Sequence, residues 1–459
     1  MAIRALDVST LARWLGPPTG MLRVERELAV HALTLPDFVA LVVYDPSCLA
    51  FRRVRPEWAK HILHWSGFLW DEPALPSRRG WRRIVPSRLS VIMALESRRL
   101  MSGSSASASA YDLAQRLVLA AKAADFPLDN PDGRRIDRVP SSLAVGEPLK
   151  LGQGDRFLTP ASDWWYKDPE VIRAIARAGA RVTAVCYDIL PLTHPQWFPA
   201  RDVERFRQHW NVLFACAHTV IVNSEHVRRE VADYCSLEGF DPPELKVAPL
   251  GALPLANALE PAPPSVLPYG LTPGRFALYV STIEPRKNHA MLLRAWRRLV
   301  DAEVPRRLGF KLVLAGRRGW WVDDVLDLLA GREGFTDSVV HLENVSDPEL
   351  GRLYREAAFC LYPSRTEGFG LPVVEAYARG KAVIVSSGGS LPEAAAGYAP
   401  CLDPDDEEGW ALAIRDWIEH PSKVADVERR IREARPFLTW PIAAQNMLEL
   451  AGLTPDAAA

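Results

Sequence analysis

Short apolar runs alternate with amphipathic stretches along most of the chain. The run RVTAVCYD at 181–188 is typical of a buried strand, and HTVIVNS at 218–224 predicts another. Between these two runs the apolar residues recur every three or four positions, as on one face of a helix: Val203, Phe206, Trp210 and Leu213. Ser224 is placed to cap the helix after the second run. This alternation indicates an α/β protein with parallel sheets.

The same pattern predicts the domain organisation. A second α/β half starts near residue 274 with RFALYV and a helix that carries Leu292, Trp296 and Leu299. Residues 253–273 contain six prolines and little periodicity, which favours an interdomain linker. We therefore expect an N-terminal domain over 1–252, with an insertion at about 76–160, a C-terminal domain over 274–435, and a terminal segment over 436–459.

Composition narrows the classes of function. Lys plus Arg number 55 and Asp plus Glu number 56, a balance that argues against a bulk nucleic-acid binder. The six cysteines form no CxxC pair, which is typical of free thiols in a reducing cytosol. No signal-peptide core and no run of eighteen uncharged apolar residues is present. We expect a cytoplasmic protein.

Residues 51–100 differ in charge from the rest of the chain. They contain eleven Lys or Arg against four Asp or Glu, interleaved with four tryptophans: Trp58, Trp65, Trp70 and Trp81. A basic surface with Trp predicts reversible contact with an anionic membrane. A solvated Arg-rich face with Trp packed beneath it is the alternative.

Two α/β domains usually bind their ligand at the carboxyl ends of the strands. The turn TEGFGLPVVEAYARG at 366–380 follows the strand predicted at FCLY. Glu367 lies on its loop, and Glu375 is expected in the first turn of the helix that Pro372 begins and Gly380 ends. A helix start between two carboxylates could bind a phosphate while the acids accept hydrogen bonds from sugar hydroxyls. Alternatively, Glu375 complements the helix dipole and Glu367 is solvated.

Three further turns leave predicted strands. In STIEPRKN, Arg286 and Lys287 precede a helix, where two cations and helix N–H groups could hold a phosphate; a solvated Arg-Lys pair is the alternative. In YDILPLTHPQWF, Asp188 follows a strand as a candidate catalytic group or a local cap, and His194 is interpreted as structural. TGMLRVE follows the strand predicted at IRALDVSTL, and its Gly20 could let backbone approach a phosphate or acceptor.

These turns together resemble those of the retaining glycosyltransferases of the GT-B fold, family 4 (glycosyl transferases group 1). Glu367 and Glu375 reproduce the E-x7-E signature of that family, and EPRKN and TGMLRVE match its diphosphate segment and glycine loop. In the first-domain motif HD-x-x-P the histidine position holds Tyr187. The family often has Gly-Arg before EPRKN, whereas this sequence has Ser281 and Thr282 there.

The resemblance implies two Rossmann-like domains facing each other across a cleft, with the segment 436–459 crossing back to the first domain. It implies transfer of a hexose from a nucleoside-diphosphate sugar with retention, without a cofactor or catalytic metal. The implied catalytic residues are Glu367, Asp188, Arg286 and Lys287. The implied donor-binding residues are Gly20, Arg286, Lys287, Gly368, Phe369, Gly370, Leu371 and Glu375.

The motifs IEPRKN, GRRGW and YDILPLTHPQWF are most similar to those of mannosyltransferases that build bacterial surface polysaccharides. We therefore expect GDP-mannose as donor and a polyprenyl-linked or other glycan as acceptor, with the enzyme cytoplasmic or peripheral on the inner face of the membrane. A nucleotide-sugar epimerase on the same fold and a non-catalytic sugar-nucleotide-binding relative remain alternatives. A dinucleotide-dependent oxidoreductase is disfavoured because no G-x-G-x-x-G follows a predicted strand.

Overall fold

The computed structural model describes residues 2–14, 20–35, 39–46, 48–63, 68–69, 139–140, 144–160, 163–252, 270–330, 335 and 337–454. The chain divides into two compact units, 1–151 and 152–459. Most of the basic stretch 51–100 and most of the Pro-rich stretch lie outside the described residues. The domain boundaries expected from the sequence stay a prediction.

The first unit contains part of an α/β sheet. Strands β1 (Arg4–Asp7) and β2 (Val39–Asp45) are parallel, and β3 (Ala50–Val54) and β6 (Val145–Pro148) continue the sheet antiparallel. Its helices are α1 (Ser9–Arg13), α2 (Gly20–Ala32) and α3 (Pro56–Ile62), and β4 (Phe68–Leu69) pairs with β5 (Val139–Pro140).

The strand expected over IRALDVSTL is shorter than predicted, because the chain becomes helical at Ser9. The Asp7 carboxylate accepts hydrogen bonds from both the backbone N–H (3.0 Å) and the hydroxyl of Ser9. An aspartate that binds the backbone two residues ahead favours a turn over continued strand.

The second unit begins with four parallel strands: β7 (Arg156–Thr159), β8 (Arg181–Cys186), β9 (Thr219–Val222) and β10 (Glu244–Val247). The connecting helices are α8 (Glu170–Arg177), α9 (Leu190–Thr193), α10 (Ala200–Cys216) and α11 (Glu225–Leu237). The four apolar residues predicted to face the core from α10 are buried. The predicted cap of α11 is also confirmed, because Ser224 Oγ accepts a hydrogen bond from Val227 N at 3.1 Å.

The second sheet has six parallel strands in the order β14-β13-β12-β15-β16-β17, the strand order of a Rossmann sheet. They are β12 (Phe276–Val280), β13 (Lys311–Ala315), β14 (Val339–Leu342), β15 (Phe359–Tyr362), β16 (Val383–Ser386) and β17 (Cys401–Leu402). The strand order reverses between β12 and β15, and the carboxyl ends at such a reversal are where α/β sheets bind ligands.

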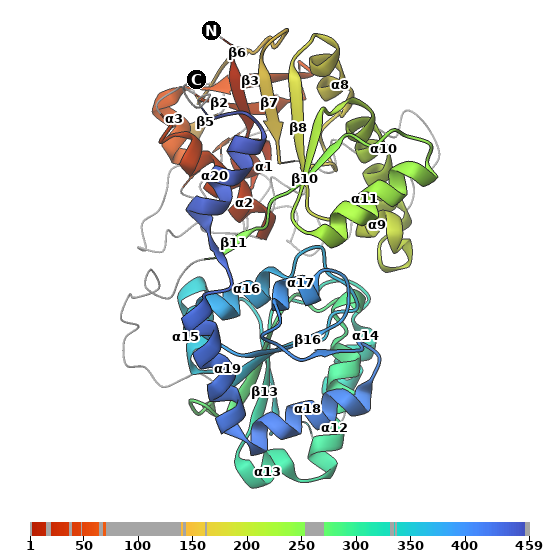
Figure 1. Ribbon diagram of the computed structural model, residues 1–459, viewed down its shortest axis with the longest axis vertical. Coiled ribbons are helices and arrows are strands. Elements are labelled where there is room, and N and C mark those ends of the chain that lie inside the picture. The colour runs from red at the N-terminus through yellow and green to blue at the C-terminus, as the bar shows by residue number, and fades with distance from the viewer. Residues whose placement is uncertain are drawn as a thin grey trace, which may run out of the picture. The chain divides into compact units, whose positions relative to one another are not determined.

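Helices lie on both sides of this sheet (Figure 1). They are α12 (His289–Asp301), α13 (Val304–Leu308), α14 (Asp323–Ala330), α15 (Asp347–Glu356), α16 (Leu371–Ala378), α17 (Leu391–Ala395), α18 (Glu407–Glu419) and α19 (Pro421–Ala434). Leu292, Trp296 and Leu299, predicted to be one apolar helix face, are buried in the core beneath α12.

The terminal segment returns to the strands of the first half of this unit. Strand β18 (Leu438–Thr439) pairs in parallel with β11 (Gly251–Ala252), and α20 (Trp440–Leu450) follows. The Arg156 guanidinium on β7 donates a hydrogen bond to the Gly452 carbonyl just after α20.

Candidate active site

Two loops meet at the reversal of the Rossmann sheet. The loop after β12 contains the 3-10 turn η4 (Pro285–Lys287) and leads into α12, and the loop after β15 leads into α16. Asn288 has a left-handed backbone (φ 61°), and its side-chain amide donates to the carbonyls of Pro363 (3.1 Å) and Pro404 (2.6 Å). The backbone N–H of Arg365 donates to the Arg286 carbonyl at 2.8 Å. These bonds join the two loops into one rigid edge.

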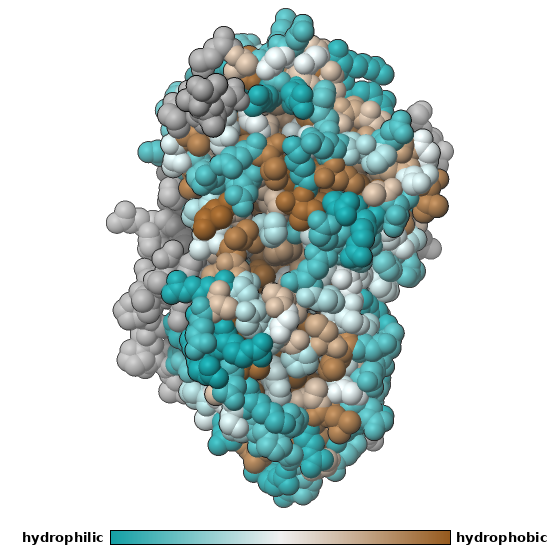
Figure 2. All heavy atoms as spheres, viewed as in Figure 1, coloured by the Kyte–Doolittle hydropathy of each residue, from teal (hydrophilic) through white to brown (hydrophobic). Residues whose placement is uncertain are grey.

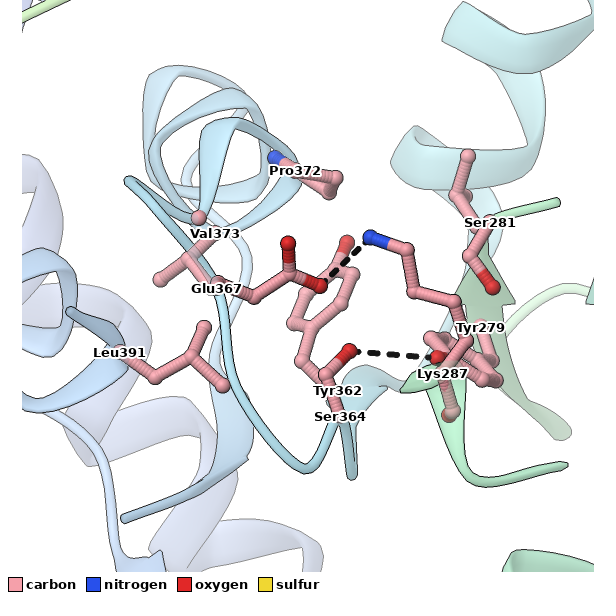
Figure 3. A pocket seen from close by; sticks show the side chains of 11 residues that line it. Tyr279, Ser281, Lys287, Tyr362, Ser364, Glu367, Pro372, Val373 and Leu391 are labelled. Atoms are coloured by element: carbon pink, nitrogen blue, oxygen red, sulfur yellow. Dashed lines mark hydrogen bonds and ion pairs between the residues drawn. The ribbon is translucent and has the colours of Figure 1, made fainter. Parts of the chain in front are cut away.

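Arg286 and Lys287 both bind Glu367, which lies about eighty residues further along the chain. The Arg286 guanidinium donates to Glu367 Oε2 at 2.7 Å and to Glu284 Oε1 at 2.8 Å, and the Lys287 ammonium donates to Glu367 Oε1 at 2.5 Å. Figure 3 shows the Lys287 side chain directed at the Glu367 carboxylate. The side chains of Glu367, Arg286 and Lys287 are only 13%, 15% and 14% exposed. The alternatives of a solvated acid and a solvated Arg-Lys pair are therefore wrong.

This ion-pair cluster determines the charge of its members. Burial alone would raise the pKa of Glu367, but Arg286 and Lys287 outweigh it and lower the pKa to about 2. Burial opposes the charge of Arg286 as well, yet the carboxylates of Glu367 and Glu284 raise its pKa. Glu367 and Arg286 are therefore both charged at neutral pH.

Asp188 lies at the carboxyl end of β8, as predicted, and close to the cluster. Burial raises its pKa, whereas the charge of Arg286 lowers it. Its Oδ1 also accepts a hydrogen bond from Leu190 N at 3.2 Å, so Asp188 orders its own turn in addition to facing the cluster.

Gly368 allows the loop of Glu367 to approach Asp188. A Cβ atom at this glycine would lie 2.3 Å from the Tyr187 carbonyl and 2.7 Å from Asp188 Cβ. The Ser224 hydroxyl, at the start of α11, donates to the Gly368 carbonyl at 2.8 Å. Any side chain at 368 would push these segments apart.

The prediction that Glu375 lies in the first turn of α16 is wrong. Glu375 is the fifth residue of the helix. The helix begins at Leu371 with Gly370 as its N-cap in a left-handed backbone (φ 89°), so Pro372 is its second residue. A first-turn dipole role for Glu375 is therefore excluded by its position. Its side chain is buried (8% exposed). Gly380 takes the left-handed conformation expected just after the helix (φ 69°).

The start of α16 and the cluster enclose a small pocket. Lys287, Glu367, Ser281, Gly370 and Pro372 are among its lining residues. Two cations and a helix N-terminus beside one pocket form a suitable site for a phosphate.

Three contributors to the site were not predicted. The Glu284 carboxylate accepts from Nη2 of Arg286, whereas Glu367 accepts from Nη1, and the Glu-Pro-Arg spacing could have indicated this contact. Ser390 donates from both its backbone N–H (3.0 Å) and its hydroxyl (2.9 Å) to the Glu367 carbonyl. Ser390 belongs to the glycine-rich turn SSGGS, which follows β16 at the same edge of the sheet. This turn could have indicated the contribution of Ser390 from the sequence. His289, whose burial lowers its pKa to about 3, is neutral and contacts Ser281 Oγ at 3.1 Å.

The remaining expectations are only partly covered by the structure. Gly20 is the first residue of α2 in the first unit, and its predicted role stays untested. Among the described residues, no group of His, Cys, Asp or Glu side chains could hold a metal ion, and metal independence stays a prediction. Within the same residues no helix is long and apolar enough to cross a bilayer. The residues predicted to touch a membrane, 51–100, are described only at 51–63 and 68–69.

Comparison with solved structures identifies the fold. The chain is similar to Anabaena HepE, solved with UDP and glucose, with a TM-score of 0.58 and 14% identity over 98% of this chain and 100% of that one. It is also similar to sucrose-phosphate synthase from Thermosynechococcus elongatus, with a TM-score of 0.57 and 16% identity over 98% of both chains. At such identity the likeness shows the fold, which is that of the GT-B glycosyltransferases and confirms the predicted fold class.

Sequence comparison then gives the family. Residues 271–434 match the model of glycosyl transferases group 1. The O-antigen chain mannosyltransferase B of Escherichia coli is 30% identical over 265 residues, 57% of this chain and 67% of that protein. The serotype-specific mannosyltransferase WbdA of Escherichia coli is 26% identical over 329 residues, 68% of this chain but only 38% of the longer relative. The chain belongs to the glycosyl transferases group 1 family and is a glycosyltransferase.

Proposed function

We propose that the protein is a retaining, metal-independent mannosyltransferase that moves mannose from GDP-mannose to a glycan acceptor during the synthesis of a bacterial surface polysaccharide. The observation that carries this proposal is the cluster of Arg286, Lys287 and Glu367 at the switch point of the Rossmann sheet. The choice of mannose is supported by the names of the two Escherichia coli relatives.

The cations of the cluster act on the leaving group. Arg286 and Lys287 hold the diphosphate beside the N-terminus of α16 and neutralise the charge that grows as the glycosidic C–O bond to phosphate breaks. Positive side chains at this place take the role that a bound metal ion has in other phosphate sites. The enzyme therefore works without a divalent cation.

The carboxylates place the sugar and the nucleotide. Glu367 orients the hexose, Glu375 binds the ribose, and Asp188 completes the sugar or acceptor site from the segment after β8. The acceptor hydroxyl attacks the anomeric carbon from the face that the diphosphate leaves, so the configuration is retained. Its proton passes to the departing diphosphate oxygen. The reaction needs positioning and charge stabilisation more than a side-chain nucleophile.

The same cluster implies a competition when the donor binds. Lys287 is already bound to Glu367, and Arg286 is bound to Glu367 and Glu284. A diphosphate that enters the pocket must therefore share these cations with Glu367. This sharing weakens ground-state binding and leaves more of the interaction for the transition state, where the phosphate charge is larger.

The proposed acceptor is a polyprenyl-linked glycan, and the enzyme is proposed to act at the inner face of the cytoplasmic membrane through residues 51–100. Gly20, at the start of α2, is proposed to let backbone approach the donor or acceptor.

The test is incubation with a panel of nucleotide sugars, with diphosphate release measured with and without glycan acceptors. GDP-mannose should release GDP faster than the UDP sugars, and acceptor should increase the rate. Inversion between donor and product would refute the retaining mechanism. Release from UDP sugars alone would refute the choice of donor, and interconversion of the sugars without transfer would indicate an epimerase.

A further inference from the structure

Two adjacent tryptophans are exposed on the turn between β13 and α14. Trp320 is 37% and Trp321 53% exposed. Among the described residues the large exposed hydrophobic side chains are Met21, Leu49, Leu237, Trp320, Trp321, Leu412 and Ile442. Only the two tryptophans in this set are neighbours in the chain. Hydrophilic residues cover most of the surface in view in Figure 2, with smaller hydrophobic patches between them.

Trp321 also has an unfavourable backbone. Its φ is 53°, in the left-handed region that a residue with a Cβ atom seldom adopts. With more than half of the side chain exposed, packing within the chain offsets only part of this cost. Strained residues of this kind are concentrated at ligand sites, where the geometry serves binding.

The turn is fixed directly against the loop that carries the two cations. Ile283 N donates to the Arg317 carbonyl at 2.9 Å, and Gly319 N donates to the Ile283 carbonyl at 2.8 Å. A Cβ atom at Gly319 would lie 2.5 Å from the Ile283 carbonyl, so the two backbones are in close contact. The turn that carries the two tryptophans is therefore held against the loop that contains Arg286 and Lys287.

Trp320 also reaches the segment that follows Asp188. Its indole N–H donates to the Trp197 carbonyl at 2.9 Å, and its ring lies 6.3 Å from that of Phe198. Trp197 in turn stacks on His194 with ring centroids 4.6 Å apart. Aromatic rings thus connect the turn after β13 with the segment that follows Asp188, to which the proposed function assigns the sugar or acceptor site.

The charge of the turn disfavours a lipid surface as the partner. The turn has two cations, Arg317 and Arg318, and Arg318 is paired with Glu343. Attachment to anionic lipids through basic residues usually takes a cluster of four or more. A sugar ring suits the site better, because its apolar C–H face can stack on an indole while its hydroxyls stay in water.

We propose that Trp320 and Trp321, with Trp197 and Phe198, form an aromatic platform that stacks against a pyranose ring of the acceptor glycan. The inference rests on the proposed function, since it names the acceptor subsite of that reaction. It assigns to these residues acceptor binding and no contact with the nucleotide.

The experiment measures binding and turnover separately in the full chain. Binding of α-mannotriose is followed by saturation-transfer NMR, binding of GDP by calorimetry, and turnover of GDP-mannose by GDP release. Trp321→Ala and Trp320→Ala should weaken α-mannotriose binding by roughly tenfold, the scale of one aromatic stacking contact, and leave GDP binding unchanged. Trp321→Phe should keep most of the affinity. Leu412→Ala, which removes an exposed apolar side chain from α18, should change neither.

The outcomes separate this inference from the proposed function. Wild-type protein that does not bind α-mannotriose, or alanine variants that bind it normally, would overturn the platform. The platform would also be overturned if the variants no longer floated with phosphatidylglycerol vesicles but still bound α-mannotriose. That result would make the turn a lipid contact. If α-mannotriose binding depends on the tryptophans while GDP-mannose is not turned over, the platform stands and the donor assignment fails. Thermal melts show whether each variant is folded.

Discussion

Replacing Glu367 by Gln should destabilise the protein and slow transfer, because this carboxylate has two buried partners. The pKa of Glu367 falls from an ordinary value of 4.5 to about 2. At 1.36 kcal/mol for each pH unit this corresponds to roughly 3 kcal/mol of stability at neutral pH. We therefore expect Glu367→Gln to lower the free energy of unfolding by about 3 kcal/mol. The substitution leaves two buried cations without their shared partner, since Arg286 and Lys287 both bind Glu367.

The pH dependence gives a second check on the same quantity. A carboxyl whose pKa is lower in the folded state stabilises the protein fully above its unfolded pKa, near 4.5, and loses this contribution as pH falls toward 2. The difference between wild type and Glu367→Gln should therefore be largest near pH 7 and shrink to about half at pH 3. Denaturation by urea at several pH values measures it.

Glu367→Gln should change the catalytic rate more than the affinity for the donor. Glu367→Gln should lower kcat by about 10², the effect of one preorganised charged contact. The affinity for GDP should be equal or higher, because the diphosphate no longer competes with a carboxylate for Lys287. Steady-state kinetics and calorimetry with GDP separate the two effects.

A matched control is available on α18. Glu407 also binds two arginines, Arg294 at 3.0 Å and Arg298 at 2.9 Å, but these side chains are about half exposed. Glu407→Gln should cost less than about 1 kcal/mol and leave kcat unchanged. The reasoning fails if both glutamine variants are equally stable, or if Glu367→Gln changes only KM.

Four further outcomes are expected. Lys287→Ala should raise KM for the donor and lower kcat together, because the charge it meets grows as the bond breaks; an unchanged rate at saturating donor would exclude that role. Glu375→Gln should raise donor KM and leave kcat nearly intact, as loss of a uniform ribose contact does, so a large fall in kcat would contradict the assignment. Activity should survive excess EDTA, and its loss with recovery on added magnesium would refute metal independence. Full-length protein should float with anionic liposomes at low salt and detach as salt rises, whereas a version with the cations of 51–100 replaced should not float.

The sequence predicted the local parts of this site well. The strand at FCLY, the helix that Gly380 ends and the serine cap of α11 depend on spacing and turn chemistry within a few residues, and all are confirmed. The errors are also local. The position of Glu375 was misjudged because α16 begins one residue before Pro372, and the first strand was overextended because the turn made by Asp7 was missed.

The pairings within the site could not be predicted in this way. Arg286 and Glu367 are about eighty residues apart, and Asp188 precedes Arg286 by nearly a hundred. Periodicity and caps give no information on which loops of a sheet become neighbours. What brings Arg286 and Glu367 together is the strand order, in which β12 and β15 are adjacent although two strands separate them in the chain. The contact between Arg286 and Glu367 therefore depends on the strand order of the sheet. Local sequence patterns do not determine that order.

The composition of the ion-pair cluster explains how such a site can stay ordered without its donor. Arg286 is paired with Glu284 and Glu367, and Lys287 is paired with Glu367, so each buried cation has a carboxylate partner. Two buried cations without these carboxylates would repel each other and bear the full cost of desolvation. The Glu284 carboxylate binds Arg286, whereas the Glu367 carboxylate binds both cations and lines the pocket. Under the proposed function, a diphosphate competes with Glu367 for both cations, and the carboxylate interactions that it displaces become available to the sugar. In the proposed mechanism, donor binding and the placement of Glu367 against the sugar therefore occur together.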